Sequence, residues 1–234
     1  MPLLWAETPH ARAVFTTRRG GLSSGPLSSL NLSWRMEEEL DGIRPDEKLV
    51  GNRDLVSDAL GTSGTWRRVR QVHGAAAVEA SRSRRHEADA LWTSHPDRPI
   101  AILVADCVPI FLGAPGRIAA VHAGWRGLVA GVVGNAVEAM GGAQEALAGP
   151  AIGPCCFEVG PEVVEAFTQR FGPAPVTDER HVDLWTAAEL AARQAGVASF
   201  HAARLCTSCH PELFFSHRRD AGRTGRQALV AALR

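Results

Sequence analysis

The chain has 234 residues, enough for one large α/β core, and its 25 lysine and arginine residues balance its 25 aspartate and glutamate residues. A formal net charge of zero argues against nucleic acid as the main partner, because binding a phosphate backbone requires a surplus of basic side chains. No apolar run is long enough to span a membrane, and residues 1–17 contain no secretion signal, so we expect a cytoplasmic protein with a single catalytic domain over residues 1–234.

The N-terminal part of the sequence predicts a functional loop followed by a helix. Residues 16–33, TTRRGGLSSGPLSSLNLS, are rich in glycine and serine, and loops of this length in compact domains are usually functional. Pro45 is followed by an aspartate that is typical of a helix start, and the apolar spacing predicts a helix that ends at Leu60. We expect Arg53 to point away from the buried face of this helix.

Strands are predicted next along the chain. Residues 66–80 predict a strand, a turn at residues 71–74 and a second strand, and the apolar run 100–104 predicts a fully buried strand at the centre of the fold. Helical periodicity predicts four further helices, at residues 128–140, 161–171, 184–195 and 224–233. We therefore expect an α/β fold in which mixed β-sheets are flanked by helices in layers.

A hairpin is predicted around residues 113–116, Gly-Ala-Pro-Gly, between apolar runs at 108–112 and 117–121. If the turn is centred on the middle of this tetrapeptide, Cys107 lies directly opposite His122. Side chains opposed in this way have Cβ atoms roughly 4.5–5.5 Å apart, a separation that suits two ligands of one ion.

Cys107 and His122, together with His73 of the 71–74 turn, form a candidate zinc site. Catalytic zinc takes three such ligands and keeps a fourth position open, with bonds of about 2.3 Å to thiolate and about 2.0 Å to imidazole. The alternative interpretation is that Cys107 is a small buried hydrophobic residue and His122 a hydrogen-bonded histidine at a strand end. The metal site is favoured because both residues lie where apolar strands end, which is where α/β folds gather ligands.

The segments that carry these residues belong to a longer set of motifs. In chain order the motifs are TTRRGGLSSG, SLNLS, RQVHG, EADALWT, ADCVPI, VHAGWRG, AIGPCCFEVG, VDLW and CTSCHPELFFSHRRDAGRTGRQ. As an ordered set over nearly the whole chain, they resemble the YfiH-like family, named the multicopper polyphenol oxidase or laccase-domain family. The resemblance implies a fold similar to that of deamidating toxins with a cysteine hydrolase site. It also implies one zinc ion bound by His73, Cys107 and His122.

The same resemblance implies a purine nucleoside enzyme. The implied reactions are phosphorolysis of adenosine, inosine, guanosine and methylthioadenosine, and deamination of adenosine to inosine. We assign catalytic roles to Cys107, His122 and Asp106, with Asp106 holding a ligand imidazole, accepting a proton or serving only as a structural support. No protein partner is implied.

Substrate-binding residues are sought among cations and amides near these motifs. Arg18 and Arg19 of the glycine-rich loop and Arg126 at a helix start are candidates for phosphate, and Asn31 for the ribose or the base. The alternative is that the arginines are solvated surface charges and Asn31 a turn residue. Trp125 is a candidate for stacking on a purine.

Three other functions stay open. Cys107 as a thiolate nucleophile with His122 as base describes a cysteine hydrolase. A multicopper oxidase is disfavoured by nine histidines without a His-x-His pair, although copper at the His/Cys/His site would still permit some oxidation. A metal-bound scaffold that edits cell-wall synthesis is the third alternative.

The remaining cysteines and a basic cluster have weaker signals. Cys206 and Cys209 match a haem-attachment pattern, which the missing export signal disfavours. The adjacent Cys155 and Cys156 lack the usual spacing of a structural zinc site, so we expect core-lining or redox-sensitive cysteines. A basic cluster suited to an anionic substrate group consists of Arg218, Arg219, Arg223 and Arg226.

Overall fold

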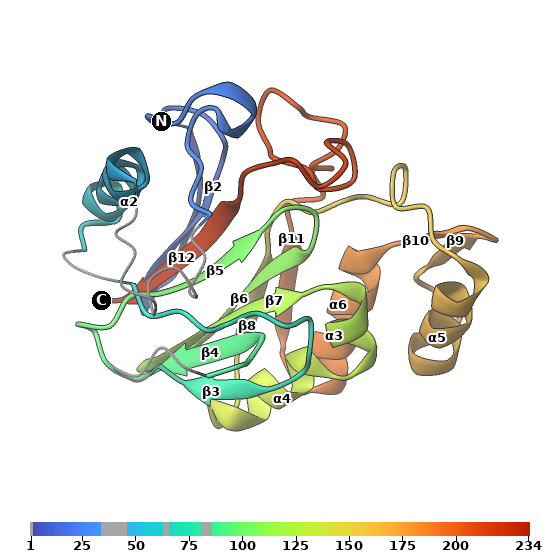
Figure 1. The fold of residues 1–234 in the computed structure, drawn as a ribbon. Helices are drawn as coiled ribbons and strands as arrows, with labels where there is room; N and C mark the ends of the chain where they lie inside the picture. The colour runs from blue at the N-terminus through green and yellow to red at the C-terminus, as the bar shows by residue number, and fades with distance from the viewer. Residues whose placement is uncertain (1, 34–45, 63–65, 81–85) are drawn as a thin grey trace.

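A computed structural model describes residues 2–33, 46–62, 66–80 and 86–234. The described chain folds into two main β-sheets with helices on their outer faces (Figure 1). The predicted fold class, mixed β-sheets flanked by helices in layers, is confirmed. Among the described residues, no helix is both long enough and apolar enough to cross a membrane.

The first sheet has four antiparallel strands in the order β1-β2-β12-β5. Their bounds are Leu3–Glu7, Ala11–Thr16, Gln227–Leu233 and Ile100–Val104. The second sheet is mixed and has the order β11-β8-β6-β7-β4-β3. Its strands span Ser199–Ala202, Glu145–Ala148, Val108–Ala114, Arg117–Ala123, Ala90–Thr93 and Ala77–Glu79. A separate two-stranded ribbon consists of β9 (Val176–Asp178) and β10 (His181–Val182).

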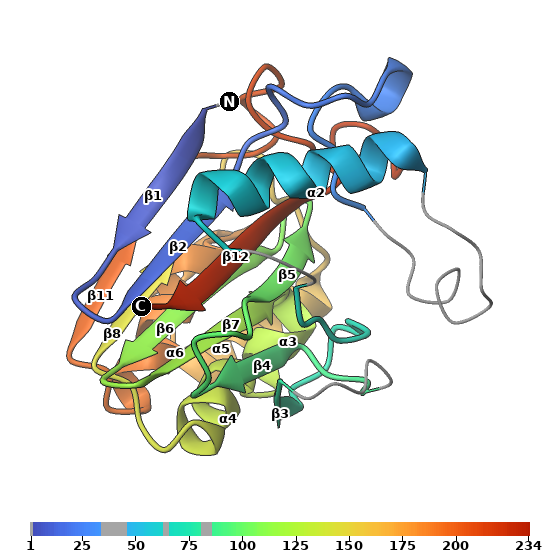
Figure 2. The ribbon, with the colours of Figure 1, turned by 90° about the vertical axis from the view of Figure 1, so that its left-hand side faces the viewer.

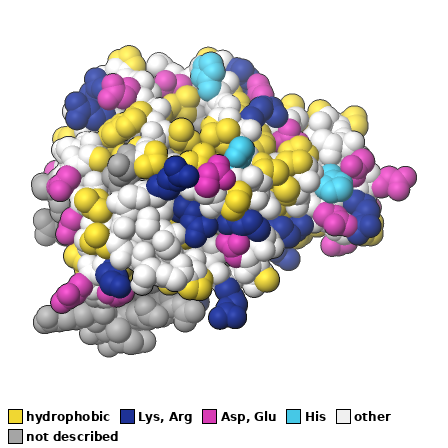
Figure 3. Space-filling model, turned by 90° about the horizontal axis from the view of Figure 1, so that it is seen from above, with side chains coloured by type: hydrophobic (Ala, Val, Ile, Leu, Met, Phe, Trp, Pro, Cys, Tyr) yellow, Lys and Arg dark blue, Asp and Glu magenta, His cyan; other side chains and the backbone are white. Residues whose placement is uncertain are grey.

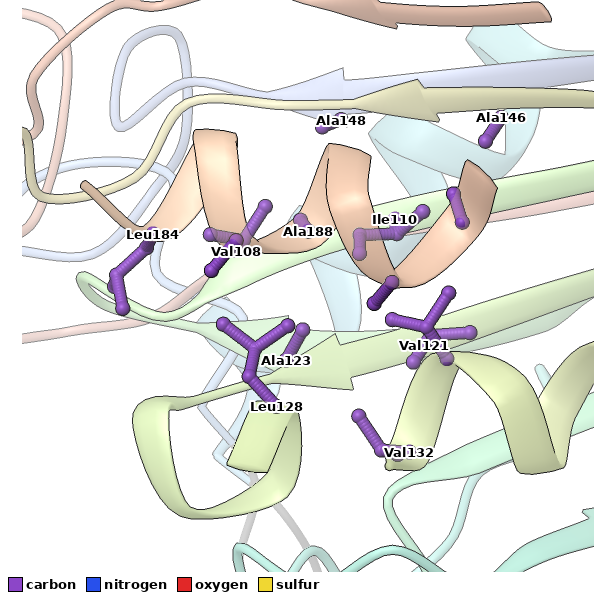
Figure 4. Close-up of a cluster of buried hydrophobic side chains, with 14 of the residues drawn as sticks. Val108, Ile110, Val121, Ala123, Leu128, Val132, Ala146, Ala148, Leu184 and Ala188 are labelled. Atoms are coloured by element: carbon purple, nitrogen blue, oxygen red, sulfur yellow. The ribbon is translucent and has the colours of Figure 1, made fainter. Parts of the chain in front are cut away.

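The described residues form five α-helices and one short 3₁₀ turn. They are the 3₁₀ turn η1 (Gly25–Leu27), α2 (Glu47–Leu60), α3 (Trp125–Val129), α4 (Val132–Ala139), α5 (Pro161–Phe171) and α6 (Leu184–Gln194). Helix α2 lies across the four-stranded sheet, where its Val56 and Leu60 pack against Val14 and Val230 (Figure 2). Helices α3, α4 and α6 lie on the outer face of the six-stranded sheet (Figure 4).

Apolar side chains of both sheets fill the space between them. Phe15 and Ile102 of the first sheet share one buried cluster with Phe111 and Ile118 of the second. Neighbouring residues in the strands point to the opposite face, since side chains alternate along a strand. Ile110, for example, belongs to the cluster under the helices. The layers are therefore helix, sheet, sheet and helices, with a core between each pair.

The predicted helix at residues 224–233 is wrong, because residues 227–233 form strand β12. Its Leu229 and Ala231 face the second sheet, whereas Ala228 and Val230 face α2. A strand buried on both faces is apolar throughout, so it lacks the alternation that distinguishes a strand from an alanine-rich helix.

Other helix predictions were confirmed in part. Helix α2 ends at Leu60 as predicted, although Pro45 at the expected start lies outside the described residues. Arg53 was expected to leave the buried face, but it is buried with its guanidinium 5.5 Å from the Trp66 ring centroid. The helix at 161–171 is confirmed, and that at 184–195 ends one residue earlier. The helix predicted at 128–140 is instead α3 and α4, separated at Gly131, whose φ is +89°.

The strand predictions differ from the structure mainly in position. Strand β5 has the predicted bounds, but it lies at the edge of the four-stranded sheet rather than at the centre. Of the two strands expected in residues 66–80, only β3 forms, while Arg67 and Arg70 make isolated bridges. Strands β1 and β2 were not predicted.

Candidate functional site

Three segments bring His73, Cys107 and His122 together. Cys107 lies in the link between β5 of the first sheet and β6 of the second, His122 lies in β7, and His73 lies in the loop before β3. Their ligand atoms, Cys Sγ and one imidazole nitrogen each, lie within 4.8 Å of one another. The two imidazole rings meet edge to face with centroids 4.8 Å apart. A thiolate and two imidazoles at this spacing suit zinc or another transition metal.

The register of the β6–β7 hairpin differs from the prediction. His122 is paired with Pro109, not with Cys107, because the turn consists of Pro115 and Gly116 alone. Gly116 adopts a φ of +71°, which glycine tolerates without strain. Cys107 therefore precedes the ladder, in a bend where Asp106 has a φ of +89°, and it still reaches His122.

Asp89, which the sequence analysis did not select, orients both histidines. It is fully buried, and its carboxylate accepts hydrogen bonds from the backbone N–H groups of Val72, His73 and Gly74 at 3.2, 3.0 and 2.6 Å. The Nδ1 of His122 lies 2.7 Å from Asp89 Oδ1. This contact leaves Nε2 of His122 for a metal, the arrangement that commonly orients ligand imidazoles. The available signal was an acidic residue between two alanines at the start of an apolar strand.

The electrostatics of the group favour an ionised thiol. Burial alone would raise the pKa of Cys107, but the charge of His122 and hydrogen bonds from both imidazoles outweigh it and lower this pKa to about 6. Burial likewise disfavours the charged form of His122, yet Cys107 and Asp89 raise its pKa to about 9. The hydrogen bond from His122 outweighs burial at Asp89 and lowers its pKa. Without a metal, these shifts favour a thiolate at Cys107 beside an imidazolium at His122.

Two glycines of the VHAGWRG motif allow the segments to approach closely. A Cβ at Gly124 would lie 3.0 Å from Cys107 Sγ and 3.2 Å from His73 Cδ2. A Cβ at Gly127 would lie 2.9 Å from the carbonyl oxygen of Gly74. Larger residues at these positions would separate the loop of His73 from the other two side chains.

The three side chains line a cleft of about 720 Å³. Five arginines line the same cleft, namely Arg68, Arg70, Arg126, Arg218 and Arg226. Viewed from above, basic side chains gather near the middle of the molecule beside hydrophobic and acidic ones (Figure 3). The concentration of guanidinium groups makes the cleft suitable for an anionic ligand.

The predicted substrate residues separate into two sets. Arg126 lines the cleft, and its guanidinium lies 4.4 Å from the Trp125 ring centroid, so both residues are available to a ligand. Arg18 and Asn31 are not among the lining residues. The Nε of Arg18 donates to the carbonyl of Ser28 at 2.9 Å, which fastens the glycine-rich loop.

Asn31 acts behind the cleft wall. Its side-chain oxygen accepts the backbone N–H of Arg226 at 2.9 Å and that of Ser33 at 3.0 Å. Arg226 belongs to the basic cluster that the sequence singled out, and burial lowers its pKa although the charges of Cys107 and Asp106 oppose this. The structure therefore places Asn31 where it positions Arg226.

His217 also lines the cleft and was not predicted.

Asp106 lines the cleft, but its carboxylate is bonded to residues other than the two histidines. Oδ1 accepts the hydroxyl of Thr207 at 2.5 Å, and Oδ2 accepts the backbone N–H of Arg218 at 2.7 Å. Its carbonyl oxygen accepts the N–H of Ile152 at 2.8 Å. Among the interpretations of Asp106, these contacts favour the structural support.

Comparison with known proteins identifies the family of the chain. Residues 12–234 match the profile of the multi-copper polyphenol oxidoreductase laccase family. A purine nucleoside phosphorylase of Deinococcus radiodurans is 38% identical, covering 100% of this chain and 93% of its own length. The purine nucleoside phosphorylase YfiH of Escherichia coli is 35% identical, with 96% and 94% covered.

Solved structures show the same fold. The crystal structure of a Neisseria meningitidis protein superimposes with a TM-score of 0.85 at 32% identity, covering 99% of this chain and 98% of that one. The crystal structure of YlmD from Geobacillus stearothermophilus gives a TM-score of 0.82 at 32% identity, with complete coverage of both chains.

Proposed function

Since the chain belongs to the multi-copper polyphenol oxidoreductase laccase family, we propose that it is a zinc-dependent purine nucleoside phosphorylase that also deaminates adenosine. The observation that carries the proposal is the convergence of His73, Cys107 and His122 in a cleft lined by arginines. The names of the relatives support nucleosides and phosphate as substrates. When bound, zinc supplies Lewis acidity at a position that three protein ligands leave open.

The cleft residues fit the needs of phosphorolysis. An oxygen of phosphate attacks C1′ of the nucleoside, the bond from C1′ to the purine nitrogen breaks, and the products are ribose 1-phosphate and the free base. Arg126 and Arg226 are suited to bind the phosphate through charge-assisted hydrogen bonds. Trp125 offers an aromatic face to the purine.

Deamination uses the same cleft with water in place of phosphate. Water attacks C6 of adenosine, the C6–N bond breaks, and ammonia leaves. Cys107 already favours the thiolate that a metal ligand must be, whereas His122 would release one proton to become a ligand, because its charged form is favoured in the metal-free pair. Both reactions therefore depend on the same three side chains.

Purified protein incubated with adenosine separates these activities by their products. We expect adenine and ribose 1-phosphate only when phosphate is present, and inosine in its absence. His73→Ala should abolish both, whereas the matched change His201→Ala, at an exposed histidine on β11, should leave them unchanged. The proposal would be disproved if zinc-loaded wild-type protein cleaved neither the bond from C1′ to the purine nitrogen nor the C6–N bond of adenosine.

A cysteine hydrolase is the second candidate, because the lowered pKa of Cys107 beside His122 is typical of a thiolate nucleophile. It predicts an acyl-enzyme on Cys107 and activity in metal-free protein.

Copper oxidation is the third candidate, since a thiolate and two imidazoles also bind copper. Activity that appears only after copper replaces zinc would favour it, and a cellular role that survives loss of the metal would favour the scaffold in cell-wall synthesis.

A further inference from the structure

Four cysteines that the proposed function does not use converge at a second place. Ligand atoms of Cys155, Cys156, Cys206 and Cys209 all lie within 4.8 Å of one another. The Sγ of Cys209 lies 3.6 Å from that of Cys155 and 3.4 Å from that of Cys156. Cys155 and Cys156 alone lack the usual spacing of a zinc site, but the fold brings Cys206 and Cys209 next to them.

The topology of the six-stranded sheet explains the convergence. Strands β8 and β11 are parallel neighbours, and a bridge between Ala151 and Cys206 continues their pairing beyond the strand ends. The turns that follow the two strands therefore lie side by side. In the first turn, the N–H groups of Cys156 and Phe157 both donate to the carbonyl of Gly153, which curls the chain tightly.

We propose that these four sulfurs bind one thiophilic divalent cation, zinc in preference to others, as a structural site separate from the cleft. Bonds of about 2.3 Å in a tetrahedron place sulfur atoms about 3.8 Å apart. The separations of 3.4 and 3.6 Å and the outer limit of 4.8 Å fit that spacing. A cluster of several irons would hold its thiolates farther apart than one ion does.

The surroundings of the sulfurs fit a metal better than a disulfide. Cys209 lies at nearly the same distance from Cys155 and Cys156, so no single partner is selected for it. The backbone N–H of Gly153 donates to the Sγ of Cys206 at 3.3 Å, the kind of contact that stabilises a coordinated thiolate. Four ligands also saturate tetrahedral zinc, which is the mark of a structural ion.

The bound ion would brace one wall of the cleft. Both cysteine-bearing segments hold Asp106, since Ile152 donates to its carbonyl and Thr207 to its carboxylate. The carbonyl of Cys156 accepts a hydrogen bond from Arg218, which lines the cleft. Fixing the two turns to each other therefore fixes the residue next to Cys107.

The metal content of the purified full chain tests the proposal. We expect two zinc ions per wild-type chain by mass spectrometry of the metal. Cys209→Ala should lose the sulfur-bound ion, and Cys107→Ala should lose the cleft ion while retaining the other. Ser208→Ala, a change within the same turn, should retain both.

A second measurement keeps all four cysteines intact. In the double variant His73→Ala/His122→Ala, Co²⁺ should bind with one equivalent and produce the thiolate-to-cobalt absorption of a tetrathiolate site. X-ray absorption of the same double variant loaded with zinc should find only sulfur ligands, at about 2.3 Å from the ion. Absence of a retained ion, a disulfide among these cysteines in freshly reduced protein or the presence of acid-labile sulfide would each overturn the proposal. The readouts on the double variant require neither the cleft ion nor enzymatic activity, so their result is independent of the proposed function.

Discussion

The cleft group and the sulfur group are built in opposite ways. His73, Cys107 and His122 come from three segments, supply three donors and face a cleft. The four cysteines come from two turns and supply four donors. A tetrahedral ion would keep a free position in the first group and none in the second. The number of converging donors therefore distinguishes a site suited to chemistry from a site suited to rigidity.

The largest expected effect comes from a substitution that removes a donor from the cleft group alone. Cys107→Ala should reduce kcat/KM for phosphorolysis by about a thousandfold or more, because it removes a ligand of the proposed ion. The melting temperature should change little, since the sulfur group stays intact. Steady-state kinetics and calorimetry measure the two effects. A variant that retains activity would show that the cleft group is not the catalytic centre.

The next effect concerns how the ligands are oriented. Asp89→Asn should weaken zinc binding in the cleft by roughly tenfold to a hundredfold, because the amide cannot replace the carboxylate that holds His122 and the loop of His73. Asp178→Asn changes a similar aspartate–histidine pair on the surface and serves as the control. Competition with a chromophoric chelator measures the affinity. Equal affinities for the two variants would contradict the role of Asp89.

The thiols of the two groups should also differ in reactivity when metal is absent. The pKa of Cys107 is lowered to about 6, whereas the hydrogen bond with Cys156 raises that of Cys209 to about 11. A lowered pKa leaves the reactive thiolate populated at lower pH, so at pH 6 iodoacetamide should alkylate Cys107 about tenfold faster than an ordinary cysteine. Peptide mass spectrometry across a pH series identifies the modified residue. Faster labelling of Cys209 than of Cys107 at pH 6 would contradict this order of reactivity.

The smallest expected effect tests whether the two groups communicate. Thr207 lies between two of the cysteines, and its hydroxyl donates to Asp106. Thr207→Val removes that bond and should lower kcat/KM several-fold, an amount on the order of one hydrogen bond. Thr207→Ser keeps the hydroxyl and should recover most of the activity. If both variants behave alike, the contact does not transmit the support.

Part of the fold could be predicted because the pattern is local. Helices α2, α5 and α6 each bury one face, so a period of 3.6 residues identifies them. Strands β6 and β7 were predicted from a turn between two apolar runs. Strand β12 was missed because both of its faces are buried, which removes the period from the sequence.

The candidate site was predicted only as a set of residue types. The motifs identified His73, Cys107 and His122, yet the predicted hairpin register that joined two of them was wrong. Asp89 and the sulfur group depend on which strands become neighbours, and a linear pattern does not encode the pairing of β8 with β11. Contacts between distant segments follow from topology, which local propensity does not determine.

The position of β12 sets the order in which the chain can complete its fold during synthesis. This strand lies between β2 and β5, although the ribosome makes it long after both. A nascent chain that lacks residues 227–233 leaves those two strands with open edges that are prone to pair with other chains. Arg226 of the cleft wall immediately precedes the same strand. The first sheet and the part of the cleft wall that Arg226 contributes are therefore both completed only when β12 inserts.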